Sequence, residues 1–204
     1  MSTSTRPAPG TTTAPAPRRA PDRLARWAAV VTVCAAVLWV ALMNQWWIAQ
    51  HVLGHVPQAA PPVRLSIDEV GFDTDVLPYS PSEEELAEDA LVPPQTYSGY
   101  FLTRYGMPGE GSENTTYVAG HSWDRIELPF NRLSDPSLVG MRLEVETLDG
   151  TLDYVVDSVA TYDKDELAGS QIWRIVPNRV VLISCYTRDA VEKNVVVVAS
   201  PADP

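Results

Sequence analysis

An uncharged apolar stretch from Trp27 to Ala49 divides the chain into two unequal parts. It contains no Asp, Glu, Lys or Arg, and it reaches the length of about 20 apolar residues that a helix needs to cross a bilayer core. Tryptophans stand near both of its ends, as they do at membrane interfaces. The stretch predicts a single transmembrane helix over residues 27–49. A cleaved signal peptide is a second interpretation, because signal peptides also carry an apolar core.

The charges flanking this stretch predict its orientation. Residues 1–26 are rich in Pro, Ala, Ser and Thr and have a net charge of +4, from five arginines and one aspartate. They predict a disordered cytoplasmic tail. The whole chain has a formal net charge of −11, so that residues 63–204 carry −15, because residues 27–62 contain no charged side chain of these four types. By the positive-inside rule, a linker over residues 50–62 leads to a domain outside the cell. A domain this acidic does not bind nucleic acid, since phosphate contacts require Lys and Arg.

The exported part has the pattern of an all-β domain. Runs of β-branched and alternating residues, separated by turns, predict strands at 63–68, 115–120, 141–147, 151–160, 179–184 and 194–200. Asp149-Gly150 predicts a tight hairpin between two of them. Such a set of strands closes into either a barrel or a sandwich.

One short helix is expected over residues 82–91, where Ser82 and Glu85 form a capping box. The acidic residues of this helix are also the type that binds calcium. However, they lack an ordered ligand spacing with a turn glycine, so a solvated helix face is the better interpretation.

The two cysteines indicate where chemistry takes place. Cys34 lies in the predicted membrane helix and Cys185 lies at the end of a predicted strand in the exported domain, so that they do not pair. Cys185 is therefore a packing residue, a partner in an intermolecular disulfide or a nucleophile. A thiol nucleophile needs a proton-transfer partner, usually histidine. His121 also ends a predicted strand, whereas His51 and His55 lie beside the apolar stretch.

Five segments together resemble the sortases, which are membrane-anchored cysteine transpeptidases of Gram-positive bacteria. The segments are "TTYVAGHSW", "PFNRL", "VGMRLEVETLDGTLDYVV", "VVLISCYT" and "NVVVVA". The resemblance covers about residues 63–200 and implies a closed eight-stranded β-barrel with few short helices. It assigns His121 and Cys185 to the family histidine and nucleophile, and Ser184 to the hydroxyl residue before the cysteine. The proline-rich tail is similar to the actinobacterial branches, classes E and F.

The chain departs from the family pattern at the arginine that usually opens the last strand. Asn194 stands at that place. Carbonyl chemistry needs a donor or cation for the developing oxyanion, and Arg188, Asn194 and Lys193 are the alternatives. Arg188 is favoured because a guanidinium offers a fixed fork of donors together with charge.

These features predict an extracytoplasmic transpeptidase that needs neither a cofactor nor a metal. Its partners would be surface proteins with a Leu-Pro-x-Thr-Gly-like sorting signal, and an amine acceptor on a peptidoglycan cross-bridge or a pilin lysine. A second group of cell-wall Cys/His transpeptidases is disfavoured, because the chain lacks the Ser-His-Gly stretch of its nucleophile. A non-enzymatic alternative is an anchored, catalytically impaired barrel that only binds sorting signals; the displaced arginine favours it, and the presence of His121 and Cys185 opposes it.

Overall fold

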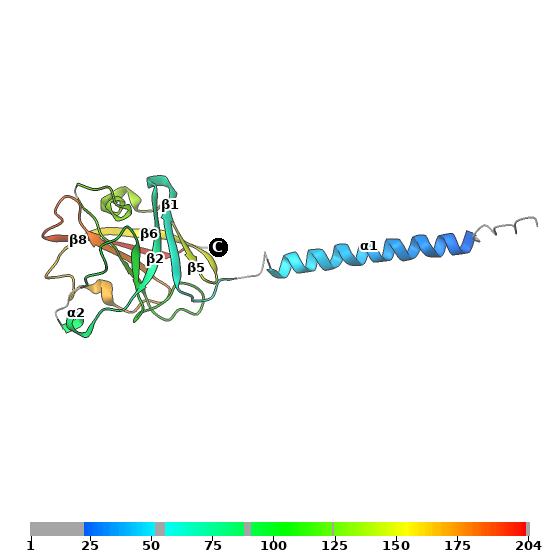
Figure 1. The fold of residues 1–204 in the computed structure, drawn as a ribbon, viewed down its shortest axis with the longest axis horizontal. Helices are drawn as coiled ribbons and strands as arrows, with labels where there is room; N and C mark the ends of the chain where they lie inside the picture. Colours follow the sequence, from blue (N-terminus) through cyan, green and yellow to red (C-terminus); the bar gives the residue numbers. More distant parts are fainter. Residues whose placement is uncertain (1–22, 52–55, 88–90, 124, 203–204) are drawn as a thin grey trace, which may run out of the picture. The chain divides into compact units, whose positions relative to one another are not determined.

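The computed structural model describes residues 23–51, 56–87, 91–123 and 125–202. Helix α1 (Arg23–His51) contains the stretch predicted to cross the membrane (Figure 1). None of the helices within the described ranges has the combined length and apolar character needed to span a membrane. The predicted disordered tail lies outside the described residues, except for residues 23–26 in α1.

The chain divides into two compact units between His55 and Val56. Residues 56–62 of the predicted linker belong to the second unit, where Ala59 N donates to Glu110 O at 2.9 Å and Glu110 N donates to Pro57 O at 2.9 Å.

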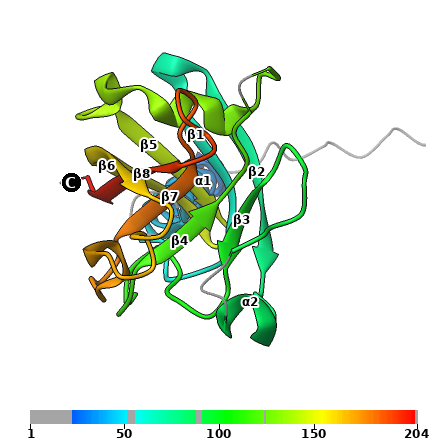
Figure 2. The same cartoon turned by 90° about the vertical axis from the view of Figure 1, so that its left-hand side faces the viewer.

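Eight strands of the second unit form one closed barrel in the order β1-β2-β3-β4-β7-β8-β6-β5 (Figure 2). Closure confirms the predicted barrel and excludes the sandwich. Neighbouring strands are antiparallel except for the parallel pairs β2–β3 and β4–β7. The strands are β1 (Pro62–Ile67), β2 (Phe72–Tyr79), β3 (Gly99–Leu102), β4 (Thr116–Ala119), β5 (Arg142–Thr147), β6 (Gly150–Asp163), β7 (Val180–Cys185) and β8 (Lys193–Pro201).

Six of these strands match the predicted ones, and β2 and β3 were missed. Strand β2 alternates buried and exposed residues as a one-sided strand should, but its Asp73, Asp75 and Pro78 are residues that strands usually lack. Strand β3 has only four residues, all buried, which is too short for a periodic pattern. The predicted hairpin is confirmed, because Thr147 pairs with Gly150 across the turn between β5 and β6.

The helices of the barrel unit are short, as expected. Helix α2 (Glu83–Ala87) has the predicted capping box, in which Glu85 N donates to Ser82 Oγ at 3.2 Å and Ser82 N donates to Glu85 Oε2 at 2.8 Å. The part of this helix predicted over residues 88–90 lies outside the described residues. The 3₁₀ turns are η1 (Asp68–Val70), η2 (Pro129–Ser134), η3 (Pro136–Leu138) and η4 (Gln171–Trp173).

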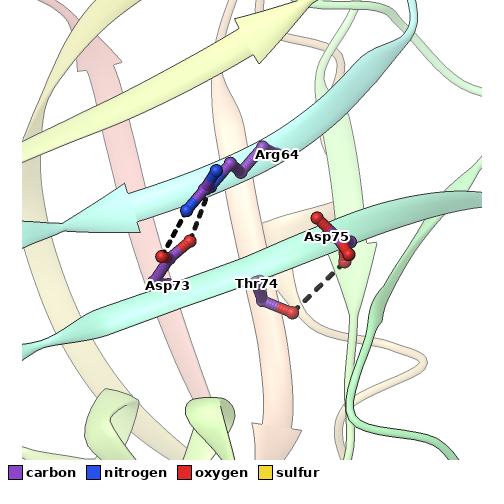
Figure 3. A network of polar contacts seen from close by, with 4 residues as sticks. All are labelled: Arg64, Asp73, Thr74 and Asp75. Carbon is purple, nitrogen blue, oxygen red and sulfur yellow. Dashed lines mark hydrogen bonds and ion pairs between the residues drawn. The ribbon is translucent and has the colours of Figure 1, made fainter.

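A charged pair joins β1 to β2 on the outside of the barrel (Figure 3). Arg64 donates from Nε and Nη2 to the two carboxylate oxygens of Asp73, at 2.7 and 2.5 Å. This bidentate hydrogen bonding holds the pKa of Asp73 below its ordinary value. Between the two exposed aspartates of β2, Thr74 is buried, and its hydroxyl contacts Asp75 O at 3.2 Å. The ion pair between Arg64 and Asp73 is half exposed, so its contribution to stability is small.

Strand β7 lies between two apolar clusters, and this arrangement decides where its cysteine lies. Val180 and Leu182 belong to the main cluster, with Phe72 and Phe130, whereas Val181 and Ile183 belong to a second cluster. The second cluster contains Leu167 and Ile172, from the segment 164–179 that joins β6 to β7. Because side chains alternate along a strand, Cys185 shares the face of Ile183. The cysteine therefore faces the second cluster rather than the main core.

Gly120, which follows β4, leaves room for the ring of Phe130. A Cβ atom at this position would lie 2.4 Å from two ring carbons of Phe130, and that ring is buried in the main core. We predict that Gly120→Ala lowers the free energy of unfolding by about 1–3 kcal/mol, the usual cost of overpacking a core, as measured by urea denaturation. The control is Gly169→Ala, whose Cβ would meet only Glu166 O at 3.9 Å. Equal stability of the two variants would contradict this account of Gly120.

Candidate active site

The parallel pairing of β4 with β7 brings His121 next to Cys185. Ala119 is the register partner of Ile183, and Gly120 N continues the ladder by donating to Ile183 O at 3.0 Å. Extending this register by two residues places His121 opposite Cys185, on adjacent strands that lie about 4.8 Å apart. Both side chains line the same pocket. The structure therefore brings together the two residues that the sequence singled out.

A buried serine ties the ends of these two strands together. Ser184 Oγ donates to Gly120 O at 2.7 Å and lies 2.6 Å from Ser122 Oγ. Ser184 and Ser122 are both almost fully buried, where such bonds are costly to lose. The hydroxyl before the cysteine thus positions the backbone on both sides of His121.

The pocket has a volume of about 590 Å³ and lies on the outer face of the barrel. Its floor is formed by the ends of β4, β7 and β8. Most of its walls come from two segments outside the sheet, and Tyr105 adds to them from the segment between β3 and β4. One wall is the β6–β7 segment, with Lys164, Leu167, Ala168 and Trp173; the other follows β2, with Glu85, Leu91 and Pro93. The pocket thus combines apolar walls with a thiol and an imidazole.

The second wall contacts His121 directly. His121 Nε2 lies 3.0 Å from the carbonyl oxygen of Pro93. A carbonyl only accepts, so this bond places a proton on Nε2, and in the neutral ring Nδ1 is then the acceptor. The imidazole also lies beside the Trp123 ring, with 6.3 Å between centroids. These contacts fix the orientation of the histidine from the side opposite the sheet.

Glu85 holds this wall in place. Its carboxylate accepts hydrogen bonds from the Tyr79 hydroxyl, from Ser82 N and, at 3.1 Å, from Val92 N, next to Pro93. The bond from Tyr79 and those from Ser82 lower the pKa of Glu85 to about 2. Burial, together with the bond to Glu85, raises the pKa of Tyr79 to about 12. At neutral pH Glu85 is therefore ionised and accepts these hydrogen bonds as a carboxylate.

The three candidates for the oxyanion role lie in different places. Asn194 is the register partner of Cys185 on β8 and lines the pocket. Lys193 points the other way and forms an ion pair with Asp163 at 2.7 Å. Arg188 is exposed in the β7–β8 turn, and the pocket lining does not include it. The pKa of Asp135 lies below its ordinary value, mainly because of the hydrogen bonds from Ser137 and to a smaller extent because of the positive charge of Arg188.

Sequence reasoning missed several pocket residues. Lys164 and the Pro93 carbonyl are two polar examples; both come from segments whose sequences carry no motif and which only the fold brings to Cys185. Cys34 and Cys185 are both free thiols. Within the described ranges, no group of three or more His, Cys, Asp or Glu side chains is arranged to hold a metal ion.

Comparisons with known proteins agree with this geometry. The family model described as Sortase domain matches residues 65–202. No curated protein matches the chain. Solved structures similar to it include sortase A of Listeria monocytogenes (15% identity, 72% of this chain and 89% of that chain covered, TM-score 0.52). Sortase C1 of Streptococcus agalactiae is 23% identical, with 69% and 67% covered and a TM-score of 0.51. A sortase D5 transpeptidase of Clostridium perfringens is 13% identical, with 76% and 86% covered and a TM-score of 0.50. At these identities the likeness shows the fold.

The hydrogen bonds of Glu85 predict a pH-dependent wall. Because its folded pKa of about 2 lies below the ordinary value of 4.5, the stabilisation is complete above about pH 4.5 and is lost as the pH falls towards 2. We expect the Val92 amide resonance to titrate with a midpoint near 2, as followed by NMR. In Glu85→Gln this titration should disappear. A midpoint near 4.5 in the wild-type chain would show that the bonds from Tyr79 and Ser82 do not lower the pKa of Glu85, and the same titration in Glu85→Gln would show that Glu85 does not hold Val92.

Proposed function

The chain belongs to the sortase family, and we propose that it is a cysteine transpeptidase that cleaves a Leu-Pro-x-Thr-Gly-like sorting signal and joins the cleaved protein to an amine. The observation that carries this proposal is the placement of His121 and Cys185 at adjacent strand ends in one pocket. A nucleophile beside a proton-transfer group is the minimum that thiol catalysis requires.

The proposed reaction has two halves. The Cys185 sulfur, as thiolate, attacks the scissile carbonyl carbon, and the π electrons of the carbonyl move to its oxygen. When this tetrahedral species collapses, the C–N bond breaks, His121 gives a proton to the departing amine, and a thioester remains. The acceptor amine then attacks the thioester and loses a proton to His121. An amide forms, and the Cys185 thiolate leaves.

Arg188 is the sequence-based candidate for holding the oxyanion of these steps. Its guanidinium has the geometry for the task, and it is only three residues from Cys185 in the chain. Its exposure and its position outside the pocket lining give this part of the proposal less support.

We also propose that the enzyme acts outside the membrane, with residues 27–49 as its anchor and the N-terminus in the cytoplasm. The uncharged apolar sequence of this stretch and the arginines before it support the proposal. The acceptor would be a peptidoglycan cross-bridge amine or a pilin lysine. Membership of class E or F remains a prediction.

A second candidate function is a barrel that binds sorting signals without cleaving them. The observation that favours it is Asn194, an amide without charge, in the place where the family carries arginine. Formation of a covalent adduct distinguishes the two functions.

The decisive test of the proposed function is adduct formation on Cys185. The full chain, incubated with Leu-Pro-x-Thr-Gly peptides, should gain the mass of the N-terminal peptide fragment as a thioester, as measured by mass spectrometry. Cys185→Ala should abolish this adduct and leave the fold intact, because the change removes one sulfur from a half-buried site. The matched control is Cys34→Ala, which removes the other thiol of the chain and should react like the wild type. Peptide binding without an adduct would support the binding module instead.

The proposed orientation predicts which part of the chain is accessible from outside. Protease added to intact protoplasts that carry the full chain should degrade residues 63–204, as detected with an antibody to the barrel unit. Detergent-treated protoplasts provide the control for total accessibility. Protection of the barrel unit in intact protoplasts would overturn the proposed orientation.

A further inference from the structure

We propose that Lys164 and Asn194 together hold the oxyanion that forms when Cys185 attacks a carbonyl. This inference rests on the proposed function and assigns a catalytic role to Lys164. It starts from a chemical need. The carbonyl oxygen takes on negative charge as sulfur adds to the carbon, and the rate depends on donors already aimed at that oxygen. Among the described residues that line the pocket, no arginine supplies such a donor.

Cys185 and Asn194 lie on the same face of the sheet. They are register partners in the antiparallel pair β7–β8, and partners of this kind have Cβ atoms about 4.5–5.5 Å apart on one face. The side-chain amide of Asn194 makes no hydrogen bond with any described side chain or backbone group. Both of its N–H donors are therefore available to a group bound above Cys185.

Lys164 lies on the same face as Asn194, just past the end of the neighbouring strand β6. Asn194 pairs with Tyr162 of β6, and the β6–β8 ladder continues past the strand end, because Lys164 N donates to Glu192 O at 2.9 Å. Two residues beyond Tyr162, the Lys164 side chain returns to the face of Asn194. It lines the pocket together with Asn194 and Cys185.

A single hydrogen bond holds the Lys164 ammonium in place. Its Nζ donates to Ala190 O in the β7–β8 turn at 2.8 Å. This bond uses one of its three donors. Within the described part of the chain, Lys164 forms no ion pair with a carboxylate. A positive charge with two remaining donors therefore lies at the pocket, next to a neutral amide with two.

The other lysine of the chain shows what the opposite face does. The sequence contains only two lysines, Lys164 and Lys193. Lys193 precedes Asn194 and so points away from Cys185. It pairs with Asp163, its register partner on β6, and is not part of the pocket lining. Of the two ammonium groups, only Lys164 is placed to act on bound substrate.

With Lys164 and Asn194 in this role, the bonds, electron pairs and protons of the reaction are all accounted for. The thiolate forms the S–C bond, the carbonyl π pair becomes the oxyanion lone pair, and neither Lys164 nor Asn194 gives up a proton. Their hydrogen bonds shorten to the oxyanion and relax when the C–N bond breaks and the carbonyl reforms. The same contacts serve the second half of the reaction, when the acceptor amine attacks the thioester.

The test compares acylation with alkylation of the same thiol. Acylation by 4-nitrophenyl acetate passes through an oxyanion and does not depend on the sorting motif, whereas alkylation by iodoacetamide forms no oxyanion. We expect Lys164→Met and Lys164→Gln each to lower the acylation rate by about 10²-fold, the scale for losing one oxyanion donor. The alkylation rate should stay near that of the wild type. Lys164→Arg should recover part of the loss, and Asn194→Ala should also slow acylation.

Lys193→Met is the matched control, because it removes an equal charge from the opposite face. Its acylation rate should remain at the wild-type level. Thermal denaturation checks that each variant is folded, and Lys164→Gln retains a donor for Ala190 O if Lys164→Met unfolds.

Three results would overturn the assignment. The first is acylation at the wild-type rate in either Lys164→Met or Asn194→Ala. The second is an equal loss of acylation and alkylation, which would place Lys164 on the thiolate. The third is a loss in Arg188→Ala with none in Lys164→Met. By contrast, if the wild-type chain is acylated by the ester but does not react with sorting peptides, the proposed function is wrong. The roles of Lys164 and Asn194 in holding the oxyanion would be unaffected by that result.

Discussion

The parallel contact between β4 and β7 is the constraint on which the site depends. Parallel neighbours carry their side chains in step, so the pairing of Ala119 with Ile183 also decides where the residues after each strand lie. His121 and Cys185 therefore meet although they are far apart in the chain. Ser184, bonded to Gly120 O, closes this register at the point where both strands end. A slip of one residue would turn Cys185 towards the main core.

Two segments outside the sheet convert this strand edge into a pocket. The β6–β7 segment packs Leu167 and Ile172 onto the outer face of β7. The segment after β2 presents the Pro93 carbonyl to His121 and is held by the Glu85 carboxylate. One wall thus rests on apolar burial, and the other on charge-assisted hydrogen bonds, which respond to pH and salt.

The third strand of the site, β8, places Asn194 beside Cys185. At the position opposite Cys185 stands an uncharged amide, Asn194. A positive charge is present on Lys164, which follows the neighbouring strand β6. Because side chains alternate along a strand, Lys164 lies on the same face as Asn194 and lines the pocket. A neighbouring strand thus offers a charged donor on the face that Cys185 and Asn194 share.

The sequence by itself determined the all-β class, six of the eight strands, the capping box at Ser82, and the candidacy of Cys185 and His121. These features rest on local physics: strand periodicity, turn chemistry and the rarity of an unpaired exported thiol. Strands β2 and β3 escaped because aspartates, a proline and short length hide their pattern. Only the tertiary structure decided that Lys164 and the Pro93 carbonyl reach the pocket, that Lys193 faces away and that Arg188 lies outside the lining. Register between distant strands settles those points, and register depends on pairing energies summed over the closed barrel rather than on any one segment.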